Sequence, residues 1–165
     1  EVLRELITRH GLTPNYNLNI RDCKFFLRAC ANERVTEGII RCLLEYFPAA
    51  ASFTSTLGNT PLQVACLNKN VTPNIVQLLI DAAPDSVRSV DEDGDTPLHN
   101  LCRNNELDET AALGILELLI DKHPEAVRHA DNDGNFPIHC IRRSPEFCRV
   151  LIEAYPGSER IANRR

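Results

Sequence analysis

Residues Gly94-Asp95-Thr96-Pro97-Leu98-His99-Asn100-Leu101-Cys102 have two close copies elsewhere in the chain. One copy is Gly58-Asn59-Thr60-Pro61-Leu62-Gln63-Val64-Ala65-Cys66, and the other is Gly134-Asn135-Phe136-Pro137-Ile138-His139-Cys140-Ile141. A second block, Leu-Ile-Asp-Ala-Ala-Pro at 79–84, returns in related form at 119–124 and 151–156, and more loosely at 43–48. Self-similarity with a period of roughly 20–50 residues is the signature of stacked repeat units.

The spacing between the two blocks shows where the units differ in length. From each Pro (48, 84, 124) to the next Gly (58, 94, 134) the distance is 10 residues every time. From each Gly to the following Pro it is 26, 30 and 22 residues. We therefore predict that one connection absorbs the variation, as an enlarged loop at Asn104–Glu109 in the longest unit.

Each unit is predicted to be a helix–loop–helix–hairpin. Thr60 and Thr96 precede a Pro, which is the pattern of an N-cap hydroxyl followed by Pro at the first helical position. The second helices have cap signals of their own and apolar residues at helical spacing. These cap signals are Thr36, Thr72-Pro73 and Ser144-Pro145. We expect each second helix to end at a Pro, because the ring cannot continue the hydrogen-bond ladder.

Gly-x-Thr-Pro-Leu-His, followed by Leu-Leu in a second helix and Asp-x-x-Gly in a turn, resembles the ankyrin repeat. The resemblance covers nearly the whole chain. It is strongest at 91–124, good at 55–84 and 131–156, and weak at 20–48. Two departures are systematic: the units are 36–40 residues long instead of 33, and Pro closes the second helix. The resemblance implies an all-α, ankyrin-like solenoid.

We expect one array over 1–165, divided into a degenerate unit at 20–54 and further units at 55–90, 91–130 and 131–165. Val2-Leu3 and Leu6-Ile7 match the second-helix pattern, so 1–11 is predicted to be the second helix of a preceding unit. The array is expected to be a fragment of a longer one.

Composition excludes several classes of protein. Among the 165 residues 43% are hydrophobic and 25% charged, as in a globular chain. The net charge of −5 argues against nucleic-acid binding through overall charge. No apolar run approaches the ~20 residues that span a bilayer. We expect a monomer that is not a membrane protein.

The seven cysteines are not spaced as a disulfide framework or a zinc ribbon. Cys30, Cys66 and Cys102 are 36 residues apart, which suggests one repeated structural position, and no CxxC pair occurs. Thiols at small inward positions of a helix behave as compact hydrophobes. Free thiols also fit a reducing compartment, so we predict an intracellular protein, cytoplasmic or nuclear.

No constellation of residues predicts an enzyme or a cofactor site. His99 and His139 invite a metal hypothesis, but equivalent positions of stacked units lie on the order of 10 Å apart. The resemblance implies instead that this His ties the hairpin to a neighbouring turn. The acidic turns fail as calcium loops, because position twelve is Asn100 or Cys140 and not Glu. We predict no catalysis, no metal and no cofactor.

A repeat stack presents an extended concave face on which other proteins bind. In the ankyrin family the hairpin tips and the exposed side of the first helices line that face. Carried onto this chain, the implied protein-binding positions are Thr56, Leu57, Asn59, Leu67, Asn68, Glu92, Asp93, Asp95, Arg103, Asn104, Asn132, Asp133, Asn135 and Arg143.

Charge is distributed unevenly along these positions. Val90–Asp95 carries four carboxylates and no cation, whereas the chain from Gly134 onward carries six Arg against three Glu. We therefore predict a protein–protein interaction scaffold whose partner is basic and meets the middle hairpins. The alternative is a structural spacer that positions flanking domains and binds nothing on its concave face.

Overall fold

The computed structural model describes Glu5 and residues 20–141 and 143–160. Within these residues the chain is helical and contains no β-strand, which confirms the all-α prediction. The α-helices are α2 (Ile20–Ala31), α3 (Glu37–Tyr46), α4 (Pro61–Cys66), α5 (Pro73–Ala82), α6 (Pro97–Arg103), α7 (Glu109–Lys122) and α8 (Pro145–Ala154). Shorter 3₁₀ helices are η1 (Pro48–Ser52), η2 (Pro84–Arg88), η3 (Pro124–Arg128), η4 (Pro137–Cys140) and η5 (Ser158–Arg160). The half unit predicted at 1–11 lies outside the described residues, apart from Glu5, and the other unit boundaries stay predictions.

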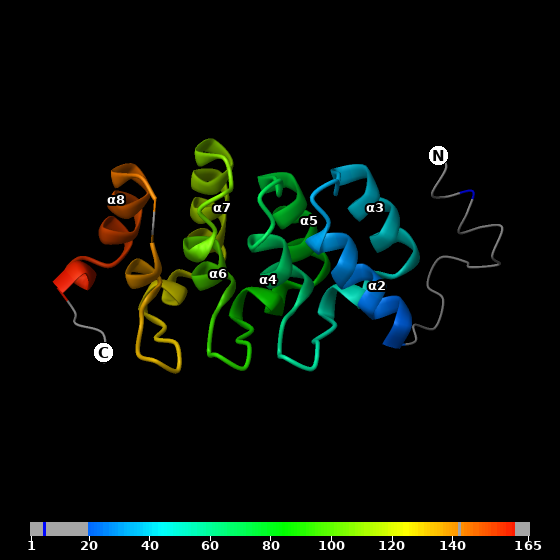
Figure 1. Ribbon diagram of the computed structural model, residues 1–165, viewed down its shortest axis with the longest axis horizontal. Coiled ribbons are helices and arrows are strands. Elements are labelled where there is room, and N and C mark those ends of the chain that lie inside the picture. Colours follow the sequence, from blue (N-terminus) through cyan, green and yellow to red (C-terminus); the bar gives the residue numbers. More distant parts are fainter. Residues whose placement is uncertain (1–4, 6–19, 142, 161–165) are drawn as a thin grey trace.

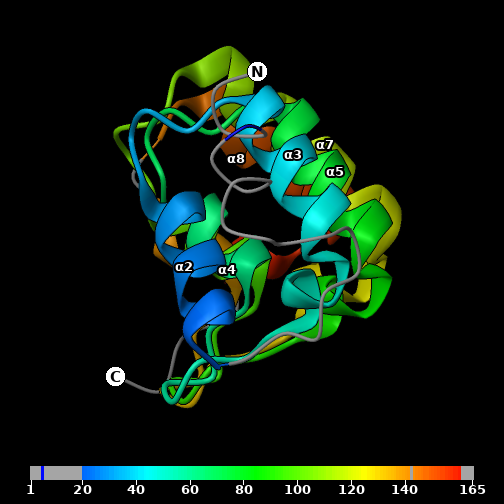
Figure 2. The same cartoon turned by 90° about the vertical axis from the view of Figure 1, so that its right-hand side faces the viewer.

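The helices stack in two layers along the long axis of the molecule (Figure 1). The first helices of successive units form one layer, in which α2 contacts α4, α4 contacts α6, and α6 contacts η4. The second helices form the other layer, where α3, α5, α7 and α8 follow one another. The hairpins that join the units all project from the same side of the stack, and seen end-on they nearly superimpose (Figure 2). This arrangement is an ankyrin-like solenoid.

Local sequence explains where the helices begin. The Thr60 hydroxyl accepts a hydrogen bond from the amide of Gln63, and Thr96 does the same for His99. The second helices begin at the predicted caps Thr36, Thr72 and Ser144. Each cap satisfies one amide that the first turn of a helix leaves without a partner.

The second helices end before the prolines, as predicted, but two residues earlier. Helix α5 ends at Ala82 and α7 at Lys122, whereas the prolines are Pro84 and Pro124. Proline disfavours the helical conformation of the residue that precedes it, so the break falls at Ala83 and His123. Pro84 and Pro124 then open the 3₁₀ helices η2 and η3.

The prediction of an enlarged loop at Asn104–Glu109 is wrong. The connection between α6 and α7 is residues 104–108, no longer than residues 67–72 between α4 and α5. The additional residues lie in α7, which has 14 residues where α5 has 10. The Asp108 carboxylate caps α7 by accepting from the Ala111 amide at 3.1 Å. Ala111, Ala112 and Leu113 are strong helix formers, so the extra length forms one more helical turn.

The last unit is shorter in two places: its first helix is reduced to the 3₁₀ helix η4, and the connection that follows, residues 141–144, is shorter than residues 67–72 between α4 and α5. Phe136 stands where the earlier units have Thr60 and Thr96, and it has no oxygen with which to cap a helix. The extra length of the unit at 91–130 therefore falls on a helix, whereas the last unit is shorter both in a helix and in the loop after it.

The core runs between the two layers through all the units. Cys30, Cys66 and Cys102 occupy equivalent inward positions and are at most 1% exposed. Burial raises the pKa of Cys30 and Cys66 to about 12, so these thiols are uncharged and unreactive at neutral pH. Cys30, Cys42, Cys66, Cys102, Cys140 and Cys148 are free thiols. No helix in the described part of the chain is both long and apolar enough to cross a membrane.

Candidate protein-binding surface

The hairpin tips are built by the same turn in each unit. Gly58, Gly94 and Gly134 have φ angles of 78°, 79° and 81°, which glycine adopts without strain. The Asp91 carboxylate accepts the amides of Asp93 and Asp95, and Ser55 and Asp131 play the same part in their own turns. These side-chain bonds hold each tip in one conformation.

Backbone hydrogen bonds join the tips to one another. The amide of Glu92 donates to the carbonyl of Leu57 at 3.1 Å, and the amide of Asn132 donates to the carbonyl of Asp93 at 2.9 Å. The side chain of Asn132 adds a bond to the carbonyl of Glu92 at 2.7 Å. The close approach leaves no room for a side chain at Gly94, where a Cβ would lie 2.7 Å from Asn132 Oδ1. The three tips therefore form one continuous row.

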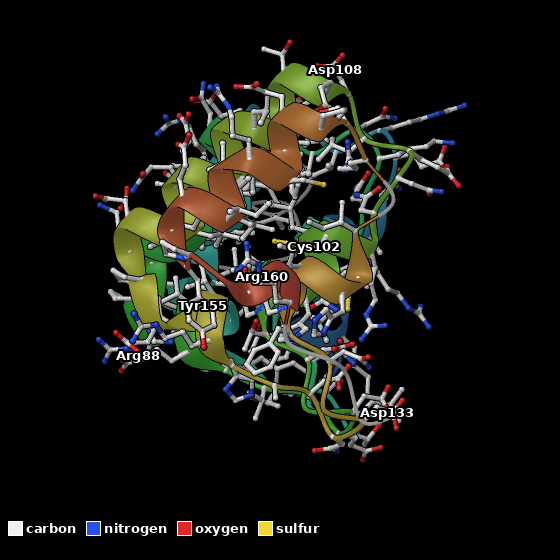
Figure 3. All side chains as sticks on the ribbon, turned by 90° about the vertical axis from the view of Figure 1, so that its left-hand side faces the viewer. Arg88, Cys102, Asp108, Asp133, Tyr155 and Arg160 are labelled. Carbon is white, nitrogen blue, oxygen red and sulfur yellow. The ribbon has the colours of Figure 1, made fainter. Side chains whose placement is uncertain are left out.

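Part of the predicted binding set is exposed on this row. We call the exposed tip residues, two per hairpin, the finger row: Thr56, Leu57, Glu92, Asp93, Asn132 and Asp133. Figure 3 shows Asp133 at the far end of its hairpin, well away from Cys102 in the interior. Asn59 is half-buried, and its side-chain Nδ2 donates to the carbonyl of Leu57. Leu57 is 60% exposed and Leu67, at the end of α4, is 48% exposed.

Asp95, Asn135 and Asp131 lie behind the finger row and are buried. The guanidinium of Arg103 donates to Asp95 Oδ1 at 2.7 Å and to Asp131 Oδ2 at 3.0 Å, and so ties two hairpins together. Burial by itself would raise the pKa of Asp131. Hydrogen bonds from Asn135 and the positive charge of Arg103 outweigh burial and hold that pKa below its usual value.

Asn68 and Asn104 were predicted to contact a partner, but both are buried between units. The Asn68 side chain donates to the carbonyls of Cys30 and Asn32, each at 2.9 Å. Asn104 donates to the carbonyls of Cys66 and Asn68 in the same way. Their positions at helix ends suggested that they are exposed. Instead, their side-chain amides donate to backbone carbonyls of the preceding unit, and little of either side chain is accessible to a partner.

Arg143 was also predicted to contact a partner, and its side chain is only 3% exposed. Its guanidinium donates to the carbonyls of Leu107 and Asn104, and it pairs with Glu109. Arg143 in the last unit thus has the same role as Asn104 one unit earlier: each donates hydrogen bonds to backbone carbonyls of the preceding unit. Asp95, Asn135, Asn68, Asn104 and Arg143 therefore hold the scaffold together, and the accessible members of the predicted set are the finger row, Asn59, Leu67 and Arg103.

His99 ties one unit to the next, as the resemblance implied. Its Nδ1 accepts from the Thr96 amide at 3.2 Å, and its Nε2 lies 3.1 Å from the carbonyl oxygen of Asn135. Gln63 makes the equivalent bond to the carbonyl of Asp95 at 2.8 Å. The Nδ1 of His139 accepts from the Phe136 amide, but its buried Nε2 has no partner among the described residues.

Asp95, His99 and Asp131 bring three potential metal ligands within 4.8 Å of one another. Their ligand atoms are already engaged, because both nitrogens of His99 are hydrogen-bonded and Arg103 lies on the two carboxylates. A cation would have to displace that guanidinium. The cluster is a hydrogen-bonded ion network between hairpins and carries no argument for metal binding.

Two hollows adjoin Arg103 on this side of the stack. One, of about 360 Å³, is lined by Asp93, Asp95, Arg103, Asp131, Asn132 and Asp133. The other, of about 270 Å³, lies beyond Arg103 toward the loops and includes Leu67, Lys69 and Glu106. A partner that binds the finger row would thus meet two hollows in the surface, with the positively charged Arg103 between them.

A family model described as ankyrin repeats (3 copies) matches residues 26–110 and 70–162. Comparison with curated protein sequences finds no match.

Proposed function

The chain belongs to the ankyrin repeat family, and from this membership we propose that it is a non-catalytic scaffold that binds a protein partner on its finger row. Ankyrin repeats are generally protein–protein interaction modules. Leu67 and Arg103, on the first helices behind the tips, would complete the contact surface. The observation that carries the proposal is the continuous row of exposed hairpin tips, joined to one another by hydrogen bonds. Stacked repeats bind other proteins on extended surfaces of this kind.

Charge supports a basic partner. Of the four carboxylates in Val90–Asp95, those of Asp91 and Asp95 accept hydrogen bonds within the protein. Glu92 and Asp93 remain exposed on the finger row, and Asp133 is exposed on the next hairpin. Arg103, the exposed cation beside these carboxylates, is already paired with the buried Asp95 and Asp131. The exposed carboxylates of the row therefore attract lysine and arginine and speed their association at low salt.

The six free thiols named above support a reducing, intracellular location for this scaffold. They do so because the cysteines of proteins in oxidising compartments are commonly paired in disulfides.

The experiment selects binders from a random peptide display library with the immobilised 165-residue chain. We expect the selected peptides to be enriched in Lys and Arg. Exchanging Glu92 and Asp93 for Lys should weaken their binding by about tenfold or more, and added salt should slow association. A matched control exchanges Asp85 and Glu125 for Lys, because both are exposed on the 3₁₀ helices, away from the hairpin tips, and the change in net charge is the same.

Selection of peptides without a basic bias, or equal losses in the two variants, would contradict a basic partner. Failure to select any binder on the finger row would favour the alternative function, a spacer that positions flanking domains.

A further inference from the structure

An apolar groove lies at the N-terminal end of the described stack, where α2 and α3 face the viewer in Figure 2. The groove has a volume of about 480 Å³ and includes Phe25, Ala29, Val35, Ile39 and Leu43 among its lining residues. Phe25 is 53% exposed, although it is one of the largest apolar side chains in the protein. The groove is separate from the finger row, so its occupant is independent of the proposed function.

The groove is built like the contact faces inside the stack. Ile39 is equivalent to Ile75 and Ile115, which are 1% and 0% exposed, but Ile39 is only half-buried. Ala29 is likewise half-buried, whereas its equivalent Ala65 is fully buried. The inner residues are covered because α3 packs on α5 and α5 packs on α7. The first unit thus presents an inter-unit face that no other described helix covers.

We propose that residues 1–10 of this chain form a helix that occupies the groove as the second helix of an incomplete unit. Val2-Leu3-Arg4-Glu5-Leu6-Ile7 aligns with Ile39-Ile40-Arg41-Cys42-Leu43-Leu44 at an offset of 37 residues. Five of the six positions match in character. The exception is Glu5, which is helical and exposed in the structure.

The segment presents the right surface. Leu3 and Ile7 are four residues apart, so on a helix they lie on one face, with Leu6 beside them. Arg4 and Thr8 correspond to Arg41 and Glu45, which are both exposed in α3. A helix in this register directs an apolar stripe at the groove and its charges at solvent.

Chain connectivity favours this occupant over a second copy or another protein. Residues 11–19 join the segment to Ile20, the first residue of α2, which forms one wall of the groove. Nine extended residues reach about 30 Å, more than the ~18 Å length of a 12-residue helix such as α2. A tether this short gives an effective concentration in the millimolar range, well above that of a free partner.

The test compares two double variants of the full chain by hydrogen–deuterium exchange. Leu3→Asn with Ile7→Asn removes the apolar stripe, and Arg4→Asn with Thr8→Asn changes the opposite face of the same segment. We expect amides of α3 from Ile39 onward to exchange about tenfold faster in the first variant and to be little changed in the control. Ile39→Asn should speed exchange in the same region, and combining it with the first variant should add little, because both act through one contact.

Equal exchange in the two double variants, or full additivity with Ile39→Asn, would overturn the proposal. So would α3 protection that falls on dilution of a dimeric wild-type protein, since a second copy would then occupy the groove.

Discussion

The imidazole of His99 in α6 reaches the backbone carbonyl of Asn135, 36 residues further along the chain, with its Nε2 3.1 Å from the oxygen. Because Nδ1 accepts from the Thr96 amide, the proton must be on Nε2, and the ring is neutral. One side chain thereby caps its own helix and fixes the next hairpin. One of the bonds between neighbouring units, behind the finger row, therefore depends on a titratable group.

We predict that acid weakens the stack partly through His99. Burial lowers the pKa of His99 in the folded protein, so below its ordinary value the unfolded chain binds the extra proton first. The stability from neutral His99 is complete above that value and is lost as the pH falls toward the folded pKa. His99→Gln should lose less of its free energy of unfolding between pH 7 and pH 5 than the wild type does, because Gln63 already makes both bonds in its own unit.

Urea unfolding at a series of pH values measures this difference. His129→Gln is the control, since His129 is exposed and only neighbours His99. A His99→Gln profile parallel to that of the wild type would show that His99 does not contribute.

The approach of neighbouring hairpins predicts a large cost for Gly94→Ala. The φ angle of 79° alone costs an alanine roughly 1–2 kcal/mol. The added Cβ would also lie within 2.9 Å of the Asn132 backbone nitrogen, so the two hairpins must separate. Gly157→Ala isolates the first effect, because Gly157 has a φ of 88° and nothing within 4 Å of the added Cβ. Equal changes in the unfolding free energy of the two variants would argue against tight hairpin packing.

Asn104 is predicted to stabilise the fold without contacting a partner. Asn104→Ala removes bonds to the carbonyls of Cys66 and Asn68 and should lower stability by about 2–3 kcal/mol, since these buried groups lose their partners. The adjacent and exposed Asn105 provides the control, and Asn105→Ala should change stability by less than about 0.5 kcal/mol. Affinity for peptides selected on the finger row should be similar in both variants at temperatures where both are folded.

Arg103 should contribute more to the stability of the fold than an ordinary surface arginine does. Arg103→Leu leaves the buried carboxylates of Asp95 and Asp131 without their cation, which should cost about 1–3 kcal/mol at neutral pH. Arg41→Leu removes an exposed pair with Glu37 and should cost about 0.5 kcal/mol or less. The deficit of Arg103→Leu should shrink as the pH falls through the lowered pKa of Asp131, because a protonated Asp131 no longer needs the cation. Thermal unfolding at neutral and acidic pH measures both effects, and a deficit independent of pH would contradict the ion network.

Much of the fold was predictable because its signals are local and repeated. Thr60 and Thr96 cap helices, and Gly94 turns a hairpin, wherever the motif recurs. The extra turn of α7 was not found, because spacing counts residues between landmarks but does not say whether they are helical. A comparison of helix propensity over Thr110–Leu113 could have found it.

The candidate site was less predictable than the fold. Position in the motif correctly placed Leu57 and Asp93 on the surface, because the tip of a projecting hairpin is exposed to solvent. It failed for Asn68, Asn104 and Arg143, whose partners lie 34–39 residues away in the chain. Arg103 was in the predicted set, but its bridge between two hairpins had no local signal.

By itself the sequence determined the repeat, the order of helices and the turns, because caps, prolines and glycines act over a few residues. Only the tertiary structure decided which polar side chains serve the scaffold and which are left for a partner. Asp93 and Asp95 are two residues apart and chemically identical, yet one is exposed and the other is buried against Arg103. The difference arises because Asp93 stands at the hairpin tip, whereas Asp95 lies behind it, where Arg103 joins it to Asp131 of the next hairpin. That contact exists only once the units are stacked.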